Sequence, residues 1–508
     1  MKAPRAIRAI LGVLLCVGGF VLARVTPFRQ TTVIVDAGGC RLVTAIVDAG
    51  EDEAQGSVVL LHGLVANQKI MWYLAQAFAL QNLRVFVPDF PGHGRTHGPF
   101  SFQRSATCSE TFVRQLVARG AIDPSRTIIA GHSMGGAIAV MTGAHIPVAG
   151  VIVISPAPMT VARGIAAFML PFDKPPATPR NTLAISAAWE PSAIRETAQD
   201  LVTADASGTG KYMLVPRASH VSVLFDRRVA RASQEWAAQA LHLPPAGTQP
   251  PLRPLVGGLA GSLGILLLAG PFLRECFGAN VRPDPASPTG AATTELAPSL
   301  FGSLLEIVLA SLFAVVLLHF ANPPHVTRVF EGDYFAAFLL LLGASLLALH
   351  YREIPAALRT SPMVVLAAAF AGLVLHLLII GWFDLTLTEA WLTAARWARF
   401  PALFVAVLPY HFAEELLLGS PTARSAKTRL ALALAFRFLA WAAILLGIFF
   451  LHSNEILLVL LAFYFGVFCL LQRAAMTVVR KCTGSPVAAA LFGAILLAGF
   501  CLVVFPIT

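Results

Sequence analysis

Two patterns of apolar residues divide this chain. Up to about residue 245, the apolar runs are four or five residues long, and glycine, proline or polar residues follow them. Runs of that length between turn residues predict buried strands. From about residue 254, the apolar runs lengthen to near 20 residues, which is enough for a helix to cross a bilayer. The sequence therefore predicts an α/β region followed by an all-α transmembrane bundle.

The short runs predict six strands, at 57–61, 83–87, 127–130, 151–154, 183–186 and 212–215. A helix of small residues follows the third strand, and Pro191 is typical of the first turn of another helix. Because strands alternate with helices, we expect a mostly parallel sheet flanked by helices.

The long runs predict eight transmembrane helices, at 254–273, 299–321, 334–350, 363–383, 401–420, 430–452, 455–472 and 487–506. The third run is short and the fifth contains charges, so seven and nine helices are the alternatives. A further apolar run at 7–23 has basic residues on both sides and no clear cleavage signal, so we interpret it as an uncleaved anchor. The predicted division is an anchor at 1–30, an α/β domain at 31–245 and a polytopic domain at 246–508.

Composition and charge fit this division. Hydrophobic residues make up 56% of the chain and charged residues 13%, unlike an ordinary soluble domain. If the N-terminus is cytoplasmic, the inner loops carry ten basic residues: Arg274, Arg282, Arg352, Arg359, Arg424, Lys427, Arg429, Arg473, Arg480 and Lys481. The outer loops carry three: Arg328, Arg396 and Arg399. This bias follows the positive-inside rule and predicts a multi-pass protein of a bacterial plasma membrane with its α/β domain outside. The net charge of +10 then reflects topology, and no basic–aromatic patch indicates nucleic-acid binding.

The strongest chemical signal is the sequence Gly131-His132-Ser133-Met134-Gly135, which stands between a predicted strand and a predicted helix. A strand, a sharp turn with a serine at its apex, and a helix form a nucleophile elbow. Glycines permit the tight turn, and the helix N-terminus stabilises negative charge that develops beside the serine. Ser133 is therefore the candidate nucleophile.

Together with His62-Gly63 and the loop 89–95 (Asp-Phe-Pro-Gly-His-Gly-Arg), this motif resembles those of the α/β-hydrolase superfamily. The resemblance is greatest to serine aminopeptidases, monoglyceride lipases and lysophospholipases, and it covers about residues 31–245. It implies an α/β-hydrolase fold, hydrolytic chemistry and an oxyanion hole formed by the backbone N–H groups of Met134 and Leu64. We expect His62 to be a turn residue that hydrogen-bonds locally.

A serine nucleophile needs a base, and the base needs an orienting carboxylate. His220 lies in the loop after the last predicted strand, where the resemblance places the general base. The resemblance places the acid in the loop after the preceding strand, at Glu190, where many relatives carry aspartate. Asp200 and Asp205 are the alternative acids.

Several features concern the surroundings of this site. Only about 30 residues separate the fourth predicted strand from Glu190, which predicts a minimal cap, and 171–179 and 278–298 are proline-rich loops. Cys40 and Cys108 are the only cysteines of the predicted α/β domain. They either form a disulfide or remain as two free thiols. The segment 384–400 is a candidate surface helix at the outer interface, with apolar Leu385, Leu387, Trp391, Leu392, Ala395 and Trp397 and basic Arg396 and Arg399.

One predicted transmembrane helix carries His411, Glu414 and Glu415 on one face. Carboxylates within a membrane are costly and often functional. The pair is similar to the E-E-x-x-x-R motif of CAAX-type intramembrane proteases, but Gly419 stands in place of the arginine. We therefore expect the two glutamates to pair with Arg424 or Arg437, or to line a polar cleft, rather than to form a second catalytic site.

The sequence thus predicts a membrane-bound serine hydrolase that cleaves carboxylic esters through an acyl-enzyme, with no metal or cofactor. Small-molecule or lipid esters are the expected substrates. Amphiphilic esters are expected to reach Ser133 from the outer leaflet of the surrounding membrane lipid. Peptidase activity is a further alternative. The competing interpretation is a transporter or sensor whose hydrolase-like domain is a binding module.

Overall fold

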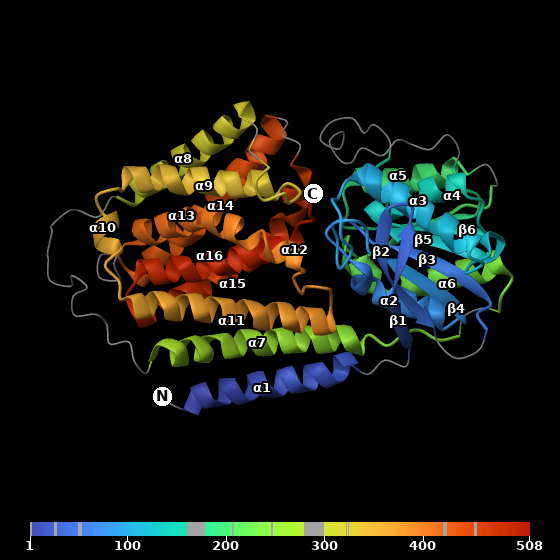
Figure 1. Cartoon of the computed structure of the whole chain (residues 1–508), viewed down its shortest axis with the longest axis horizontal. Coiled ribbons are helices and arrows are strands. Elements are labelled where there is room, and N and C mark those ends of the chain that lie inside the picture. Colours follow the sequence, from blue (N-terminus) through green and yellow to red (C-terminus); the bar gives the residue numbers. More distant parts are fainter. Residues whose placement is uncertain are drawn as a thin grey trace. The chain divides into compact units, whose positions relative to one another are not determined.

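The computed structural model describes residues 3–24, 28–48, 53–159, 178–205, 208–244, 247–278, 299–321, 323, 325–419, 424–451 and 455–508. The chain forms two units, which we call the helical unit and the sheet unit (Figure 1). The helical unit comprises Met1–Gly18, Ala260–Trp382 and Trp391–Phe505. The sheet unit comprises Gly19–Leu259, Phe383–Ala390 and Pro506–Thr508. The sheet unit is thus assembled from segments that are far apart in the sequence.

An eight-stranded sheet forms the centre of the sheet unit. Its strands are β1 (Arg29–Ala37), β2 (Cys40–Asp48), β3 (Gly56–Leu61), β4 (Leu83–Pro88), β5 (Thr127–His132), β6 (Gly150–Ile154), β7 (Thr182–Ala187) and β8 (Lys211–Val215). The strand order is β1-β2-β4-β3-β5-β6-β7-β8. The pairs β1–β2 and β2–β4 are antiparallel, and all later pairs are parallel. The six predicted strands are confirmed as β3 to β8, and the mostly parallel sheet is confirmed with them.

The inner strands are apolar along their whole length because helices cover the sheet. Every residue of β3, β5, β6 and β7 is buried, as expected for parallel strands with helices against them. The helices are α2 (Trp72–Ala79), α3 (Phe102–Ala118), α4 (Met134–His145), α5 (Ser192–Thr203) and α6 (Arg227–Leu241). Helices α2 and α6 share one hydrophobic core with the strands, and α3 packs on α4.

Strands β1 and β2 form a hairpin that the sequence analysis missed. They join through Gly38 and Gly39, whose φ angles of +62° and +88° suit a two-residue turn that glycine adopts without strain. At the turn, Cys40 forms a disulfide with Cys108 of α3. Of the two alternatives for these cysteines, the structure therefore has the disulfide.

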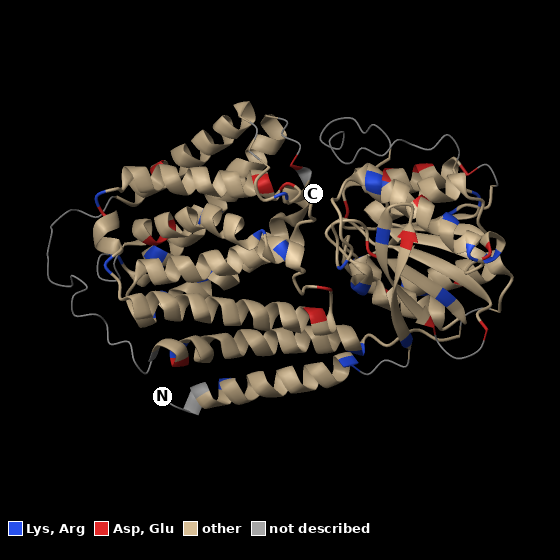
Figure 2. Cartoon of the chain, in the orientation of Figure 1, with Lys and Arg blue, Asp and Glu red and all other residues tan. Residues whose placement is uncertain are grey.

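The helical unit is dominated by long apolar helices. Among the described residues, nine helices are long and apolar enough to cross a membrane, and charged residues are sparse along them (Figure 2). They are α1 (Ala3–Arg24), α7 (Arg253–Gly278), α8 (Leu300–Phe320), α9 (Gly332–Leu349), α11 (Pro362–Thr386), α13 (Phe400–Leu418), α14 (Ala426–Phe450), α15 (Ile456–Thr483) and α16 (Pro486–Val504). These helices lie at the positions of the eight predicted C-terminal spans and of the apolar run at 7–23.

Two predictions about the ends of these helices were wrong. Helix α15 continues to Thr483, so Arg473, Arg480 and Lys481 lie in a helix and not in a loop. The segment 384–400 is not a surface helix: only α12 (Ala394–Trp397) is helical between α11 and α13. Its Arg396 is buried and donates to the carbonyl oxygens of Leu502 and Phe505. The sequence pattern predicted Arg396 at a membrane surface, but its guanidinium is buried and stabilised by hydrogen bonds to backbone carbonyl oxygens.

Two segments from late in the chain complete the sheet unit. Residues 383–390, which end α11 and continue beyond it, contact the loop after β3. Near residue 507, the Phe100 N–H donates to the Ile507 carbonyl oxygen at 2.6 Å, and the Ile507 N–H donates to the Gly92 carbonyl oxygen at 3.1 Å. Both segments therefore bind loops that follow the carboxyl ends of β3 and β4, where ligands usually bind in such sheets.

Candidate active site

Ser133 occupies the sharp turn between β5 and α4. Its φ of +53° and ψ of −120° are rarely adopted by residues other than glycine, so the turn holds the serine in a strained conformation. A Cβ at position 131 would lie 2.1 Å from the Gly135 carbonyl oxygen, and one at position 135 would lie 2.4 Å from the Leu61 carbonyl oxygen. Both glycines of the motif are therefore required for the turn to close.

Backbone hydrogen bonds hold this turn at the centre of the sheet. The Ser133 N–H donates to the Ile154 carbonyl oxygen at 3.0 Å, and the Ala157 N–H donates to the Ser133 carbonyl oxygen at 2.9 Å. The turn is thus fixed to β6 and to the residues that follow it. A serine held this way keeps its position without relying on its own side chain.

The two predicted oxyanion donors lie beside this turn. Met134 is the first residue of α4, so its N–H has no acceptor within the helix. Leu64 is in the loop after β3, and a Cβ on the preceding Gly63 would lie 3.1 Å from the Ser133 Cβ. The loop that carries Leu64 therefore packs directly against the candidate nucleophile, as an oxyanion loop must.

Glu190 and His220 come together as the sequence predicts. The His220 Nδ1 lies 2.6 Å from Glu190 Oε1, and the Ala187 N–H donates to Glu190 Oε2 at 2.7 Å. The Glu190 side chain is fully buried, whereas the imidazole is 31% exposed. A carboxylate that accepts from Nδ1–H leaves Nε2 free to act as a base.

The alternative acids lie elsewhere. Asp200 is exposed on α5, and Asp205 is buried beside Gly210, where a Cβ would lie 2.9 Å from the Asp205 carboxylate. Among the described residues, Glu190 is the carboxylate that contacts His220. The structure therefore groups Glu190, and neither aspartate, with the candidate base.

His132 supports the candidate base, a role that the sequence analysis did not identify. Its Nε2 donates to the backbone carbonyl oxygen of His220 at 2.8 Å, and the two imidazole rings lie 4.7 Å apart. Burial, and then the charge of His220, hold the pKa of His132 well below its usual value of 6.5. His132 is therefore neutral at neutral pH and donates from the one nitrogen that carries its proton.

His62 has the local turn role that was expected of it. Its Nδ1 donates to the Gly63 carbonyl oxygen at 2.8 Å, and its Nε2 accepts from the Phe90 N–H at 3.0 Å. Burial lowers the pKa of His62 to about 4. The neutral imidazole thus ties the loop after β3 to the loop after β4.

The two glutamates of α13 form ion pairs within the helical unit. Glu414 accepts two hydrogen bonds from Arg437, both at 2.9 Å, and Glu415 accepts from Arg473 at 2.6 Å. Arg480 lies 3.5 Å from Glu415, and Arg424 donates to Ser303 at 3.1 Å. The pairing with Arg437 is confirmed, and Arg473 and Arg480 supply charges that the sequence analysis had placed in a loop.

Two predictions fall outside what the structure describes. Residues 160–177, between β6 and β7, are not among the described residues, so the minimal cap stays a prediction. The loop predicted at 278–298 also lies almost wholly outside them. In the described ranges, no group of three or more His, Cys, Asp and Glu side chains is placed to hold a metal ion.

Comparisons with known proteins agree with this architecture. Residues 58–262 match the sequence profile of the alpha/beta hydrolase family. One curated relative, a monoacylglycerol lipase of Mycolicibacterium smegmatis, is 33% identical over 125 residues, which are 24% of this chain and 44% of the relative. The match therefore spans less than half the length of that relative.

Solved hydrolase structures align with less than half of the chain. A hyperthermophilic esterase from Pyrobaculum calidifontis is 16% identical, with a TM-score of 0.35, and the alignment covers 47% of this chain and 93% of the esterase. A soluble variant of monoglyceride lipase from Saccharomyces cerevisiae is 16% identical, with a TM-score of 0.33, and the alignment covers 43% and 97%. The family match and the strand order assign the α/β-hydrolase fold to the sheet unit.

Proposed function

We propose that this alpha/beta hydrolase is a membrane-bound serine hydrolase that cleaves carboxylic esters. The observation that carries the proposal is the buried Glu190 carboxylate on the Nδ1 of His220, in the sheet unit that presents Ser133 on a strained turn. Backbone strain and a buried charge both lower stability. Their presence at one site is therefore expected where the function requires them. Together they supply a nucleophile, a base and an orienting acid.

In the proposed reaction, Ser133 Oγ attacks the ester carbonyl carbon while His220 Nε2 takes its proton. The carbonyl oxygen becomes an oxyanion that accepts from the N–H groups of Met134 and Leu64. When the tetrahedral intermediate collapses, His220 returns the proton to the leaving alkoxide, and an acyl-serine remains. Water then attacks the acyl-serine with the same proton transfers, which release the carboxylic acid and restore Ser133. Glu190 stays ionised and stabilises the imidazolium at both stages.

We further propose that the substrates are amphiphilic esters, such as lipid esters. The relative in Mycolicibacterium smegmatis is a monoacylglycerol lipase, and this chain has long apolar helices that suit a membrane protein. Trp189, which precedes the acid, is 70% exposed. An exposed tryptophan beside a catalytic loop is suited to hold an acyl chain or to enter a lipid interface.

The proposed arrangement is an integral, multi-pass membrane protein with its hydrolase domain on the extracytoplasmic side. An N-terminal anchor at 1–30, a hydrolase domain at 31–245 and a polytopic domain at 246–508 remain the proposed division. The disulfide between Cys40 and Cys108 supports the extracytoplasmic placement, because disulfides persist in oxidising compartments. The excess of basic residues in the predicted inner loops supports the same orientation.

Fluorophosphonate labelling of the full chain in detergent tests the chemistry. We expect a covalent adduct on Ser133, no adduct in Ser133→Ala, and hydrolysis of acyl esters by the wild type. If the wild type neither labels nor hydrolyses esters of any length, the sheet unit is a binding module and the membrane part carries the function.

An ester series of increasing acyl length tests the substrate class. We expect Trp189→Ala to lower kcat/KM for long-chain esters roughly tenfold or less, the scale of one lost apolar contact, and to leave short-chain esters unchanged. Leu214→Ala, which removes another exposed apolar side chain from the edge strand β8, is the matched control. Equal effects at all lengths would contradict a role for Trp189 in acyl-chain binding.

Single cysteines at exposed positions test the orientation. A membrane-impermeant maleimide should label Arg119→Cys in intact cells, and should label Lys427→Cys only after permeabilisation. The wild type, which has free cysteines at other positions, gives the background. The reverse pattern would place the hydrolase domain in the cytoplasm.

A further inference from the structure

Residues 388 and 389 hold the loop that carries a proposed oxyanion donor. We propose that Glu389, together with Thr388, is a positioning residue for hydrolysis at Ser133: it fixes the loop 63–71 from outside the continuous hydrolase sequence. This inference rests on the proposed function, because it assigns a role in that reaction. The contacts that carry it all lie within the sheet unit, which contains Phe383–Ala390.

Asn67 makes the first set of contacts. Its Nδ2 donates to Thr388 Oγ1 at 2.9 Å and to the Glu389 carbonyl oxygen at 3.1 Å. Its Oδ1 accepts from the Glu389 N–H and from the Lys69 N–H, both at 3.2 Å. One buried side chain therefore caps the short helix η1 (Gln68–Met71) and binds the backbone of the distant segment. If the segment moves away, the cap loses three of its four partners.

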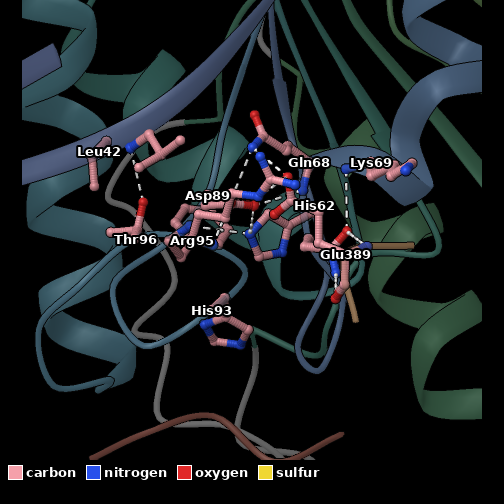
Figure 3. Close-up of polar contacts among 12 residues, drawn as sticks. Leu42, His62, Gln68, Lys69, Asp89, His93, Arg95, Thr96 and Glu389 are labelled. Carbon is pink, nitrogen blue, oxygen red and sulfur yellow. Dashed lines mark hydrogen bonds and ion pairs between the residues drawn. The ribbon is translucent and has the colours of Figure 1, made fainter. Parts of the chain in front are cut away.

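Gln68 makes the second set, between two carboxyl groups (Figure 3). Its Nε2 lies 2.9 Å from Glu389 Oε1 and 3.2 Å from Asp89 Oδ2, and its backbone N–H donates to Asp89 Oδ1 at 2.7 Å. The Arg95 N–H also donates to Asp89, at 3.0 Å. Glu389 thus joins the loop after β3 to the loop after β4 through a buried hydrogen-bond network.

These contacts reach the oxyanion donor over a very short stretch of chain. Leu64 is three residues before Asn67, and the Ala66 N–H donates to the Gly63 carbonyl oxygen at 3.2 Å, which closes a turn between them. Val65 in this turn has a φ of +66°, which is strained for a β-branched residue. A strained turn holds its shape only when its surroundings fix it. Loss of the Glu389 contacts should therefore displace the Leu64 N–H.

The Asp89 carboxyl group at this junction is buried beside Glu389. Burial first, and then the charge and hydrogen bond of Glu389, raise the pKa of Asp89 well above its ordinary value of 3.8. The other groups that face the pair are the charged Arg95, 3.5 Å from Glu389, and the neutral imidazole of His62, whose Nε2 is 3.9 Å from Asp89. Lys69 and Asp384 lie at its margin: Lys69 donates to the Asp384 carbonyl oxygen, and the Asp384 carboxylate is 3.6 Å from Arg95.

The sign of the pH effect follows from this arrangement. An acid whose pKa is raised in the folded state favours that state below the raised pKa, and this contribution is lost as pH increases through it. When the proton leaves, two buried carboxylates face each other with one nearby guanidinium. The segment should therefore hold the loop most tightly on the acid side of the raised pKa.

Substitutions of Glu389 in the full chain test the proposal. Glu389→Ala removes the contacts with Gln68 and Asp89, and we expect kcat for a short soluble ester to fall about ten- to a hundredfold with KM nearly unchanged, the scale of a misplaced catalytic group. Glu389→Gln retains an acceptor for Gln68 and gives Asp89 a donor that does not titrate. We expect it to restore most of kcat and to weaken the loss of rate at alkaline pH that follows from the raised pKa of Asp89. Glu235→Ala, an exposed glutamate on α6, is the control.

A second readout does not depend on activity. Amide hydrogen exchange in 64–71 should become faster in Glu389→Ala than in the wild type or in Glu235→Ala. Unchanged exchange in 64–71, or unchanged kcat in a protein whose Ser133 labels normally, would overturn the proposal. Absence of labelling and hydrolysis in the wild type would instead overturn the proposed function, and the exchange result would still decide whether Glu389 holds the loop.

Discussion

Glu190 in the sheet unit and Glu414 in the helical unit are both fully buried carboxylates, and they differ in their partners. Glu190 accepts from an imidazole that is 31% exposed and from one backbone N–H. Glu414 accepts twice from the Arg437 guanidinium, and Arg473 lies 3.5 Å away. Both arrangements neutralise a buried charge, but Glu190 is bound by an imidazole, whereas Glu414 is bound by a guanidinium and has the His411 imidazole 3.6 Å away.

The partner of each buried glutamate indicates whether that glutamate is suited to proton transfer or to stabilising the packing of helices. A guanidinium stays protonated, so the Glu414 pair can stabilise packing but cannot pass a proton. An imidazole changes its charge, so the pair of Glu190 and His220 is suited to the proton transfer that we propose at Ser133. Burial of an acidic residue is therefore a poor guide to function until the group that faces it is known.

The largest expected effect on kcat comes from substitution of the proposed nucleophile or the proposed base. Ser133→Ala and His220→Ala should each lower kcat by about 10⁶-fold, because each removes a member of one catalytic unit. The double variant should be scarcely worse than either single variant. Steady-state kinetics on a short ester, with circular dichroism to verify folding, gives the measurement. Losses that multiply in the double variant would show that the two residues act independently.

Glu190→Gln should come next, with a fall in kcat of about 10⁴-fold. The amide cannot stabilise the imidazolium and favours the wrong tautomer, while binding of the ester should be little affected. Asp200→Asn and Asp205→Asn serve as controls, and we expect both to keep nearly full activity. A larger loss in either aspartate variant would move the acid away from Glu190.

Glu414→Gln should have the opposite profile. It leaves Arg437 buried with no full countercharge, which typically costs about 3 to 5 kcal/mol, so thermal unfolding of the helical unit should shift to lower temperature. Turnover of a short ester, measured below that temperature, should be unchanged. The surface pair of Glu110 and Arg114 offers a control in Glu110→Gln, since exposed pairs contribute little. A loss of activity without a loss of stability would give Glu414 a chemical role after all.

The smallest expected effect is a pH dependence of the stability of the sheet unit. His62 has a pKa of about 4 when folded and about 6.5 when unfolded, so the unfolded state binds more protons between these values. Stability should fall as the pH decreases from 6.5 to 4, by on the order of 3 kcal/mol for this group. His132 should add a loss of the same sign. His62→Gln should flatten the dependence, and an unchanged slope in chemical denaturation would contradict this assignment.

The fold was predictable where local sequence decides it. Apolar runs bounded by turn residues identified β3 to β8, and runs near 20 residues identified the long helices. The hairpin of β1 and β2 had a usable signal in Gly38-Gly39 between two alternating runs, and it was missed. Helix α15 was cut short because Arg473 was interpreted as a loop residue, and only its pairing with Glu415 explains why a helix can continue through it.

The candidate site was predictable to the extent that family motifs mark it. Ser133, Glu190 and His220 each follow a recognisable strand, so their order along the chain is informative. His132 had no separate signal, because its contact is with the backbone of His220. Glu389 had none either, since its partners Gln68 and Asp89 lie about 300 residues earlier and no local pattern records such a contact.

The late position of two segments also determines when the enzyme becomes complete during synthesis. At about 5 to 20 residues per second, Phe383 follows Leu259 by roughly 6 to 25 s, and Pro506 follows it by roughly 12 to 50 s. Throughout that interval, the loops around Gln68 and Gly92 lack partners that they have in the finished structure. In a nascent chain, therefore, the loop that carries Leu64 is not yet held by its late partners. We therefore expect the proposed hydrolysis to begin only after most of the apolar helices have been made.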